Sequence, residues 1–210
     1  MYDTILFLDF DGTITSEDTL EGSMQLCIDP SIYEEEKKAL TAGERSLSDT
    51  LHLAFNMIPS SKIDAILDYV DQVALRPGFE ELLDVADGLG IPVVVISGGL
   101  ESYIERKLAP YKDKILDFHG VGVDLSGEHI KLISAYETKG ELVQKTLIMD
   151  QYEYKKAISV GDNITDYRMA LASDQVFARD TLAAIMEKNK LPFTPWEDFY
   201  DVARSISSSK

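Results

Sequence analysis

The segment Ile5-Leu6-Phe7-Leu8-Asp9-Phe10-Asp11-Gly12-Thr13 decides the fold. Four apolar residues run directly into a polar stretch that carries two carboxylates, Asp9 and Asp11. A short run that is apolar at every position is typical of a central parallel strand, buried on both faces. Ligands of open α/β sheets gather where such strands end. The segment therefore predicts a parallel sheet with acidic side chains at the carboxyl end of its first strand.

Two later apolar runs end in the same way. Ser97-Gly98-Gly99 follows the run Ile91–Ile96, and Gly161-Asp162-Asn163 follows the run Ala157–Val160. Amphipathic helices lie between these strands, and Leu125-Ser126-Gly127-Glu128 predicts the turn of a β-hairpin. The alternation of helix and strand predicts an α/β protein with a doubly wound parallel sheet.

A block of helices interrupts this alternation after the first strand. From Asp18 to about Ala74 the apolar residues recur with helical spacing, and no convincing strand is present. The expected helices are Leu20–Cys27, Ser31–Leu40, Ser46–Met57 and Ser60–Val73. A further helix is expected over Gly140–Met149. The sequence thus predicts a small α-helical insertion in the sheet domain.

Composition restricts the partners and the location. The 210 residues include 37 acidic and 20 basic side chains, for a net charge of −17. This charge repels phosphate backbones and anionic lipid, so we expect neither nucleic acid nor membrane as a partner. Cys27 is the single cysteine, the start of the chain lacks signal-peptide features, and no apolar run is long enough to span a bilayer. We expect a cytoplasmic protein; the sequence predicts no oligomeric state.

The strand ends bring several acids to one edge of the sheet. Asp9 and Asp11 follow the first strand, and Asp162 and Asp166 follow a later one. Any one of them alone is as easily explained as a turn former or helix cap. Together, however, they repel one another unless a cation neutralises them. Oxygen ligands without paired His or Cys favour Mg²⁺, so the cluster predicts a magnesium site.

The motifs, taken in order, resemble those of the haloacid dehalogenase-like (HAD) superfamily in its phosphatase form. Asp9-Phe10-Asp11-Gly12-Thr13 is similar to the first motif and Val95-Ile96-Ser97-Gly98-Gly99 to the second. Lys139 stands for the third motif and Gly161–Asp166 for the fourth. The resemblance implies a Rossmann-like catalytic core, residues 1–15 and 76–210, with a helical cap, residues 16–75, inserted after the first strand.

The same resemblance implies an enzyme that hydrolyses the phosphate monoester of a small phosphorylated metabolite. Asp9 would attack phosphorus and form an aspartyl-phosphate, and Asp11 would act as general acid and then general base. Ser97, Gly98 and Lys139 would bind the phosphoryl oxygens.

The resemblance also implies the ligands of Mg²⁺. They would be Asp9, Asp162 and the main-chain carbonyl of Asp11, with Asp166 as an outer or additional ligand. Haloacid dehalogenation is disfavoured, because that reaction has no need of the second carboxyl group at Asp11.

The helical insertion resembles the cap of the branch that contains phosphoserine phosphatases. Four segments are more similar to the phosphatase family of methionine salvage: Ile58–Ser61, Arg76–Phe79, Phe177–Asp180 and Trp196–Tyr200. Met24, Phe55 and Met57 either line the substrate side of this cap or pack in the core.

Two alternatives stay open. A phosphoserine phosphatase needs a basic residue in the cap for the substrate carboxylate; Leu51–Met57 offers His52 and no Arg or Lys, although Arg45 could substitute. The second alternative is of another class, a phospho-accepting signalling or binding domain without turnover, which would also group acids, a hydroxyl and a lysine around Mg²⁺.

Overall fold

The computed structural model describes residues 1–208; residues 209 and 210, the last two of the expected core, lie outside the described part. Within residues 1–208, seven strands form one sheet in the order β4-β3-β2-β1-β5-β6-β7. All neighbours are parallel except β3 and β4, which form the predicted hairpin. The strands are β1 (Tyr2–Leu8), β2 (Val93–Leu100), β3 (Asp117–Asp124), β4 (Lys131–Ile133), β5 (Tyr154–Gly161), β6 (Gln175–Ala178) and β7 (Thr194–Pro195).

Strand β1 lies at the centre of the sheet, with β2 on one side and β5 on the other. Leu8, its last residue, pairs with Val95 of β2 and with Val160 of β5. The strand order reverses direction between β1 and β5, and open α/β sheets bind ligands at such a switch point. The polar residues that follow β1 and β5 meet Ser97 at one place, as the sequence predicts. The expected end of the second strand at Ile96 is wrong, because β2 continues to Leu100 and includes Ser97, Gly98 and Gly99.

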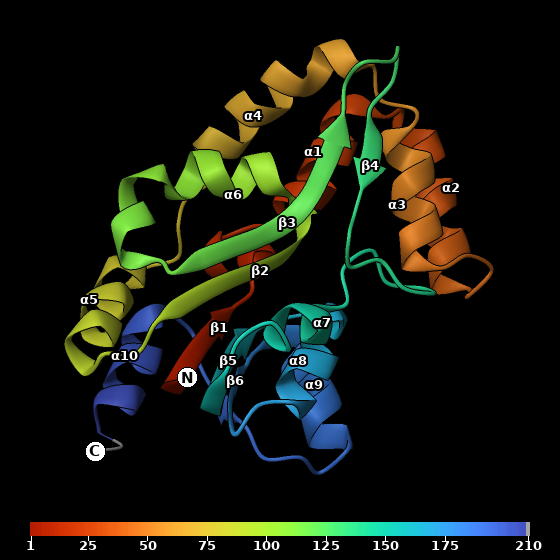
Figure 1. Cartoon of the computed structure of the whole chain (residues 1–210). Helices are drawn as coiled ribbons and strands as arrows, with labels where there is room; N and C mark the ends of the chain where they lie inside the picture. Colours follow the sequence, from red (N-terminus) through yellow and green to blue (C-terminus); the bar gives the residue numbers. More distant parts are fainter. Residues whose placement is uncertain (209–210) are drawn as a thin grey trace.

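Helices cover both faces of the sheet (Figure 1). Helices α5 and α10 pack together on one face, and α7, α8 and α9 lie on the other. The helices are α1 (Thr19–Cys27), α2 (Pro30–Thr41), α3 (Leu47–Phe55), α4 (Ile63–Gln72), α5 (Phe79–Leu89), α6 (Glu101–Leu108), α7 (Lys145–Met149), α8 (Tyr167–Leu171), α9 (Asp180–Lys188) and α10 (Phe199–Ser207). Among residues 1–208, none of these helices has the length and apolar character needed to cross a membrane.

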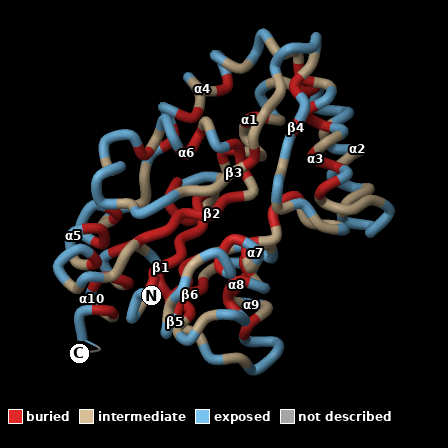
Figure 2. Tube along the Cα trace, viewed as in Figure 1, coloured by how far each residue is buried: buried red, intermediate tan, exposed pale blue. Residues whose placement is uncertain are grey.

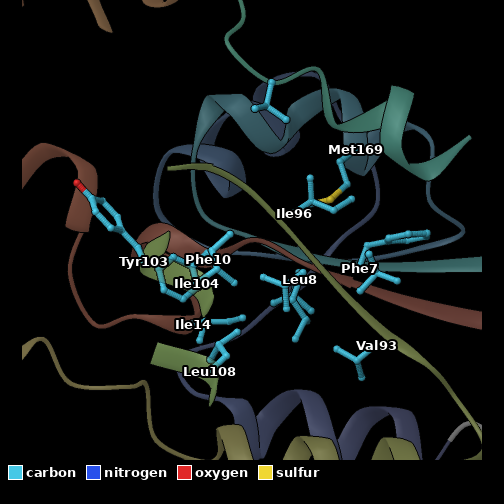
Figure 3. Close-up of a cluster of buried hydrophobic side chains, with 14 of the residues drawn as sticks. Phe7, Leu8, Phe10, Ile14, Val93, Ile96, Tyr103, Ile104, Leu108 and Met169 are labelled. Carbon is cyan, nitrogen blue, oxygen red and sulfur yellow. The ribbon is translucent and has the colours of Figure 1, made fainter. Parts of the chain in front are cut away.

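The core lies around the central strands. Buried residues concentrate along β1 and β2, whereas α2 contains no buried residue (Figure 2). In Figure 3, Met169 of α8 lies against Ile96 of β2, and Leu108 of α6 lies near Ile14. The central strands are thus packed on both faces, which explains why their sequences are apolar at consecutive positions.

Helices α1 to α4 form the predicted insertion between β1 and α5. The chain enters and leaves this block through two paired linkers: the amide of Ser16 donates to the carbonyl of Ala74 at 2.9 Å, and the amide of Arg76 donates to the carbonyl of Ile14 at 2.8 Å. These two hydrogen bonds join the linkers beside the expected limits, residues 16 and 75. We keep residues 16–75 as a proposed cap unit and residues 1–15 with 76–210 as a proposed core.

The expected helix over Gly140–Met149 is wrong at its start. Helix α7 begins only at Lys145. Gly140 has a φ of +99°, and the amide of Thr138 donates to the carbonyl of Glu141 at 3.0 Å, so residues 138–141 form a tight turn. A turn with a left-handed glycine does not continue into an α-helix. The first residue of the helix is therefore Lys145 and not the expected Gly140.

Candidate active site

Asp9 lies where β1 leaves the sheet. Its amide donates to the carbonyl of Val160 at 3.0 Å, which extends the pairing with β5 by one residue. The next residues make the wide turn η1 (Phe10–Ile14), which is closed by the amide of Thr15 donating to the carbonyl of Phe10 at 3.0 Å. Asp9 is 4% exposed. The candidate nucleophile is therefore fixed by the central strand and is almost fully buried.

Asp11 is held by donors from two different elements. Its Oδ1 accepts hydrogen bonds from the amide of Thr19, at 3.0 Å, and from the Thr19 hydroxyl, at the start of α1. Its Oδ2 accepts from the hydroxyl of Ser97 at 2.8 Å. A Cβ at Gly99 would overlap Oδ2 of Asp11, so only glycine leaves room for this carboxylate. The helical block and β2 together set the position of the candidate acid and base.

Asp162 follows β5 and faces the turn after β1. Its Oδ1 accepts a hydrogen bond from the hydroxyl of Thr13 at 2.7 Å. Gly12 has a φ of +76°, and a Cβ there would lie 2.7 Å from Oδ2 of Asp162. Glycine at this position serves both the left-handed conformation and the close approach of the carboxylate.

Asp166 is buried beneath the loop that follows β5. Its Oδ2 accepts from the amides of Asp162 and Asn163, both at 3.0 Å. Its Oδ1 accepts from the ammonium of Lys145 at 2.6 Å. Asp166 therefore fixes the Asp162 loop and connects it to a lysine.

Lys145, rather than Lys139, is the lysine in this cluster. The side chain of Lys145 is 1% exposed, and its ammonium donates to both Asp9 and Asp166. Lys139 is exposed in the turn before α7. The late start of α7 explains the difference, because the helix N-terminus carries Lys145 into the site. The available signal was a lysine five residues after Gly140, ahead of the apolar residues Ile148 and Met149.

Three carboxylates are close enough to hold a metal ion. Asp9, Asp162 and Asp166 each offer an oxygen, and these oxygens all lie within 4.8 Å of one another. An all-oxygen donor set fits Mg²⁺ and does not fit the softer metals that select His or Cys. The residues present therefore suit the expected cation. Asp9 and Asp166 both accept from Lys145, so the expected outer or additional place of Asp166 stays a prediction.

The electrostatics of the cluster also favour a cation. Burial raises the pKa of Asp9 well above its usual range, and the nearby Asp166 carboxylate raises it further. Burial and Asp166 raise the pKa of Asp162 to about 6. Burial alone would lower the pKa of Lys145, but Asp166 and Asp9 raise it above its ordinary value. The single ammonium thus leaves an excess of negative charge.

Asp11 and Asp18 form a second, partly separate acidic pair. Burial raises the pKa of Asp11, although the hydrogen bonds from Thr19 and Ser97 oppose this. Burial and the nearby Asp11 raise the pKa of Asp18 to about 7. Asp18 also caps α1 by accepting from the amide of Glu21 at 2.8 Å. Asp18 was not expected in the site, because its sequence pattern is that of an ordinary helix cap.

A cavity of about 250 Å³ extends from the acids into the helical block. Asp9, Asp11 and Lys145 line its inner end, together with the Gly98 backbone. The helical block and the loop before α7 contribute ten apolar residues to its lining: Leu20, Met24, Ile28, Leu40, Leu47, Leu51, Ala54, Met57, Leu142 and Val143. The lining also contains polar and charged residues: Asp18, Glu21, Tyr33, Glu36, Lys37, Thr50, Glu141, Asn163 and Thr165. Of the three residues considered for the substrate side, Met24 and Met57 line this cavity, whereas Phe55 packs in the core.

The fold and the site define a class of protein. The sheet has acids at the ends of β1 and β5, and β2 carries the Ser97 hydroxyl, as the HAD motifs predict. The buried lysine of the arrangement is Lys145 and not the predicted Lys139. The family model of the haloacid dehalogenase-like hydrolases matches residues 6–171. The chain belongs to this family, and its predicted fold class is confirmed.

The chain is also similar to individual phosphatases that share one name. The chain is 35% identical over 200 residues to the 2-hydroxy-3-keto-5-methylthiopentenyl-1-phosphate phosphatase of Microcystis aeruginosa, covering 94% of this chain and 95% of the relative. It is 32% identical over 210 residues to the protein of the same name from Brevibacillus brevis, covering 96% and 94%.

Solved structures show the same fold at lower identity. A HAD family hydrolase from Salmonella enterica superimposes with a TM-score of 0.78 at 18% identity, covering 100% of this chain and 73% of the other. A phosphoserine phosphatase with a phospho-aspartyl intermediate analogue gives a TM-score of 0.73 at 15% identity, covering 98% and 99%.

Proposed function

We propose that the protein hydrolyses 2-hydroxy-3-keto-5-methylthiopentenyl-1-phosphate, with Asp9 as nucleophile, in the cytoplasm. The observation that carries the proposal is the apolar wall of the cavity, which begins beside the catalytic acids and contains Met24 and Met57. A methylthio tail has no charge or strong hydrogen-bonding group, so an apolar wall binds it by removing its surface from water.

In the first step a carboxylate oxygen of Asp9 attacks phosphorus and the ester oxygen leaves. Lys145 donates to Asp9, which orients this carboxylate and balances the negative charge that the phosphate brings. Asp11 gives its proton to the leaving oxygen. The raised pKa of Asp11, caused by burial, helps it to hold that proton near neutral pH.

In the second step water attacks the phosphoryl group and releases Asp9. Asp11, now ionised, accepts the proton of this water. Its hydrogen bonds from Thr19 and Ser97 keep the carboxylate at one position through both steps. The backbone of Gly98 lies at the inner end of the cavity, where it suits contact with phosphoryl oxygens.

Asp9, Asp162 and the carbonyl of Asp11, with Asp166 behind them, would hold Mg²⁺. When bound, the ion supplies positive charge that offsets the repulsion between the nucleophile and the phosphate dianion.

Within residues 1–208, the lining of the cavity contains no unpaired cation for a substrate carboxylate. Among its lining residues within the described chain, the basic side chains are Lys37 and Lys145, and each is paired with acids. Arg45, the other candidate, is paired with Glu36. Phosphoserine would leave its carboxylate unmatched here, which favours the methylthiopentenyl ester.

The test compares the two phosphate esters side by side in the presence of Mg²⁺. We expect kcat/KM for the methylthiopentenyl ester to exceed that for phosphoserine by about 100-fold or more, because a buried charge without a partner is strongly rejected. Equal values, or a preference for phosphoserine, would contradict the assigned substrate. Stable phosphorylation without repeated turnover would instead support the phospho-accepting alternative.

A further inference from the structure

Arg76 lies in the linker by which the chain leaves the helical block. Its side chain contacts the turn that carries Asp11. Its Nε donates to the carbonyl of Thr13 at 2.9 Å, and its Nη2 donates to the carbonyl of Gly12. A longer contact of 3.5 Å joins Nη2 to the carbonyl of Thr15. One guanidinium therefore contacts three carbonyl oxygens of the chain that follows β1.

These carbonyls need a donor from outside the turn. Gly12 is left-handed, and Asp11 has an extended ψ of 120°, so turn η1 does not form regular helical hydrogen bonds throughout. Buried carbonyl groups without partners are costly. The planar fork of an arginine can bridge neighbouring carbonyls, whereas a lysine cannot reproduce this geometry.

Trp196 and Arg179 lie against Arg76 on the side of the C-terminal segment. The guanidinium carbon of Arg76 lies 5.4 Å from the centroid of the Trp196 ring, and that of Arg179 lies 5.3 Å from it. Trp196 is 4% exposed and packs against Phe199, with ring centroids 5.1 Å apart. Cation–π contact with a buried indole restricts the position of the guanidinium.

We propose that Arg76 is a positioning residue for Asp11, and that Trp196 holds Arg76 in place. Residues near the C-terminus thereby set the geometry of a catalytic turn at the other end of the chain. The kinetic consequence rests on the proposed function, whereas the structural consequence does not. The carboxyl group of Asp11 must contact Ser97, Thr19 and the leaving oxygen at the same time. A displacement of this group by about 1 Å therefore reduces turnover by up to about 100-fold.

The test uses Arg76→Met, Arg76→Lys, Trp196→Leu and Trp196→Phe in the full chain. Arg204→Met is the matched control, because Arg204 is exposed and pairs with Asp201 on α10. Two quantities are measured: kcat and KM for p-nitrophenyl phosphate with Mg²⁺, and amide hydrogen exchange of the segment 10–16.

We expect Arg76→Met to lower kcat by about tenfold to 100-fold while KM changes by less than about threefold. Exchange in segment 10–16 becomes faster in the same variant. Trp196→Leu shows both effects to a smaller extent. Arg76→Lys keeps the positive charge but does not bring kcat back to the parent value. Trp196→Phe retains an aromatic ring beneath the guanidinium and stays close to the parent protein. Arg204→Met changes neither quantity.

Unchanged exchange in segment 10–16 of Arg76→Met would overturn the proposal. Faster exchange with the parent kcat per folded molecule would also overturn it, because the contact would then be structural only. If Arg76→Met does not fold, Arg76→Lys and Trp196→Leu are judged by the same measurements. If the parent protein hydrolyses no phosphate ester, the proposed function fails, and the exchange measurement alone decides whether Arg76 holds the turn.

Discussion

The ammonium of Lys145 donates to the carboxylate of Asp166 at 2.6 Å, in a place where both side chains are at most 1% exposed. The same ammonium also donates to Asp9. It is the internal cation of a cluster that contains three carboxylates. We therefore expect the site to depend on this lysine for charge balance as well as for orientation of Asp9, the proposed nucleophile.

Replacing Lys145 with Met removes that charge. We expect kcat for an aryl phosphate to fall by about 100-fold or more, since the developing negative charge loses a preorganised donor. The metal-free protein loses about 3–5 kcal/mol of unfolding free energy, because buried carboxylates are left without their partner. Lys139→Met, in the exposed turn, is the control and keeps the parent kcat. The opposite result, with Lys139 essential and Lys145 dispensable, would overturn the site described above.

Binding of Mg²⁺ is expected to depend on pH. In the metal-free protein burial raises the pKa of Asp162 from 3.8 to about 6. The folded state thus binds this proton more tightly than the unfolded state. The protonated Asp162 therefore contributes to the free energy of unfolding at pH values below the unfolded pKa of 3.8, and this contribution is lost as the pH rises through about 6. A bound divalent cation would take the place of the proton.

Mg²⁺ should therefore raise Tm more at about pH 7.5 than at about pH 5.5, where protons compete for the carboxylate. Thermal unfolding with and without Mg²⁺ measures this difference. Asp162→Asn, which has no such proton to exchange, should lose most of the Mg²⁺-dependent increase at both pH values. Equal increases in the parent protein at both pH values would contradict the predicted competition.

Gly99 is expected to tolerate no side chain, because a Cβ there would overlap Oδ2 of Asp11. Gly99→Ala should displace the acid and lower kcat by about tenfold or more. Gly88→Ala is the matched control: its Cβ meets nothing within 4 Å, and it lies in helix α5. This control should keep the parent kcat and gain up to about 1 kcal/mol of stability from helix propensity. A fully active Gly99→Ala variant would argue against the described position of Asp11.

The apolar wall should determine the choice of substrate. Met24→Glu places a charge beside the expected methylthio tail, so kcat/KM for the methylthiopentenyl ester should fall by about 10-fold to 200-fold. Leu26 lies on the same helix, but it is 54% exposed and does not line the cavity. Leu26→Glu should therefore retain the parent kcat/KM. Equal losses in both variants would point to damage to α1 and not to substrate selection.

The sequence was most informative where local chemistry is unambiguous. The runs Ile5–Leu8 and Ala157–Val160 are buried central strands, and their apolar character at consecutive positions leaves few alternatives. The acids after them could be expected to converge, because parallel strands end at one edge of a sheet. Helices α1 to α4 also occur where their apolar periodicity predicts them.

Contacts distant in sequence were beyond such reasoning. Lys139 and Lys145 both lie near a plausible helix start, and the left-handed Gly140 decides between them only in the folded chain. Arg76 is separated by 120 residues from Trp196, whose ring it contacts, and neither residue type predicts the other. Helix α10 was missed, although its Asp198 accepts from the amides of Tyr200 and Asp201 as a helix cap.

In the proposed mechanism, Asp9 carries the phosphoryl group during turnover. The most direct measurement is rapid acid quenching of the enzyme during hydrolysis of the methylthiopentenyl ester, followed by mass spectrometry of its peptides. We predict one added phosphoryl group on Asp9, formed within the first turnover and absent from Asp9→Asn, which is inactive. Continued turnover by Asp9→Asn, or a phosphoryl group on another residue of the active parent protein, would contradict the account.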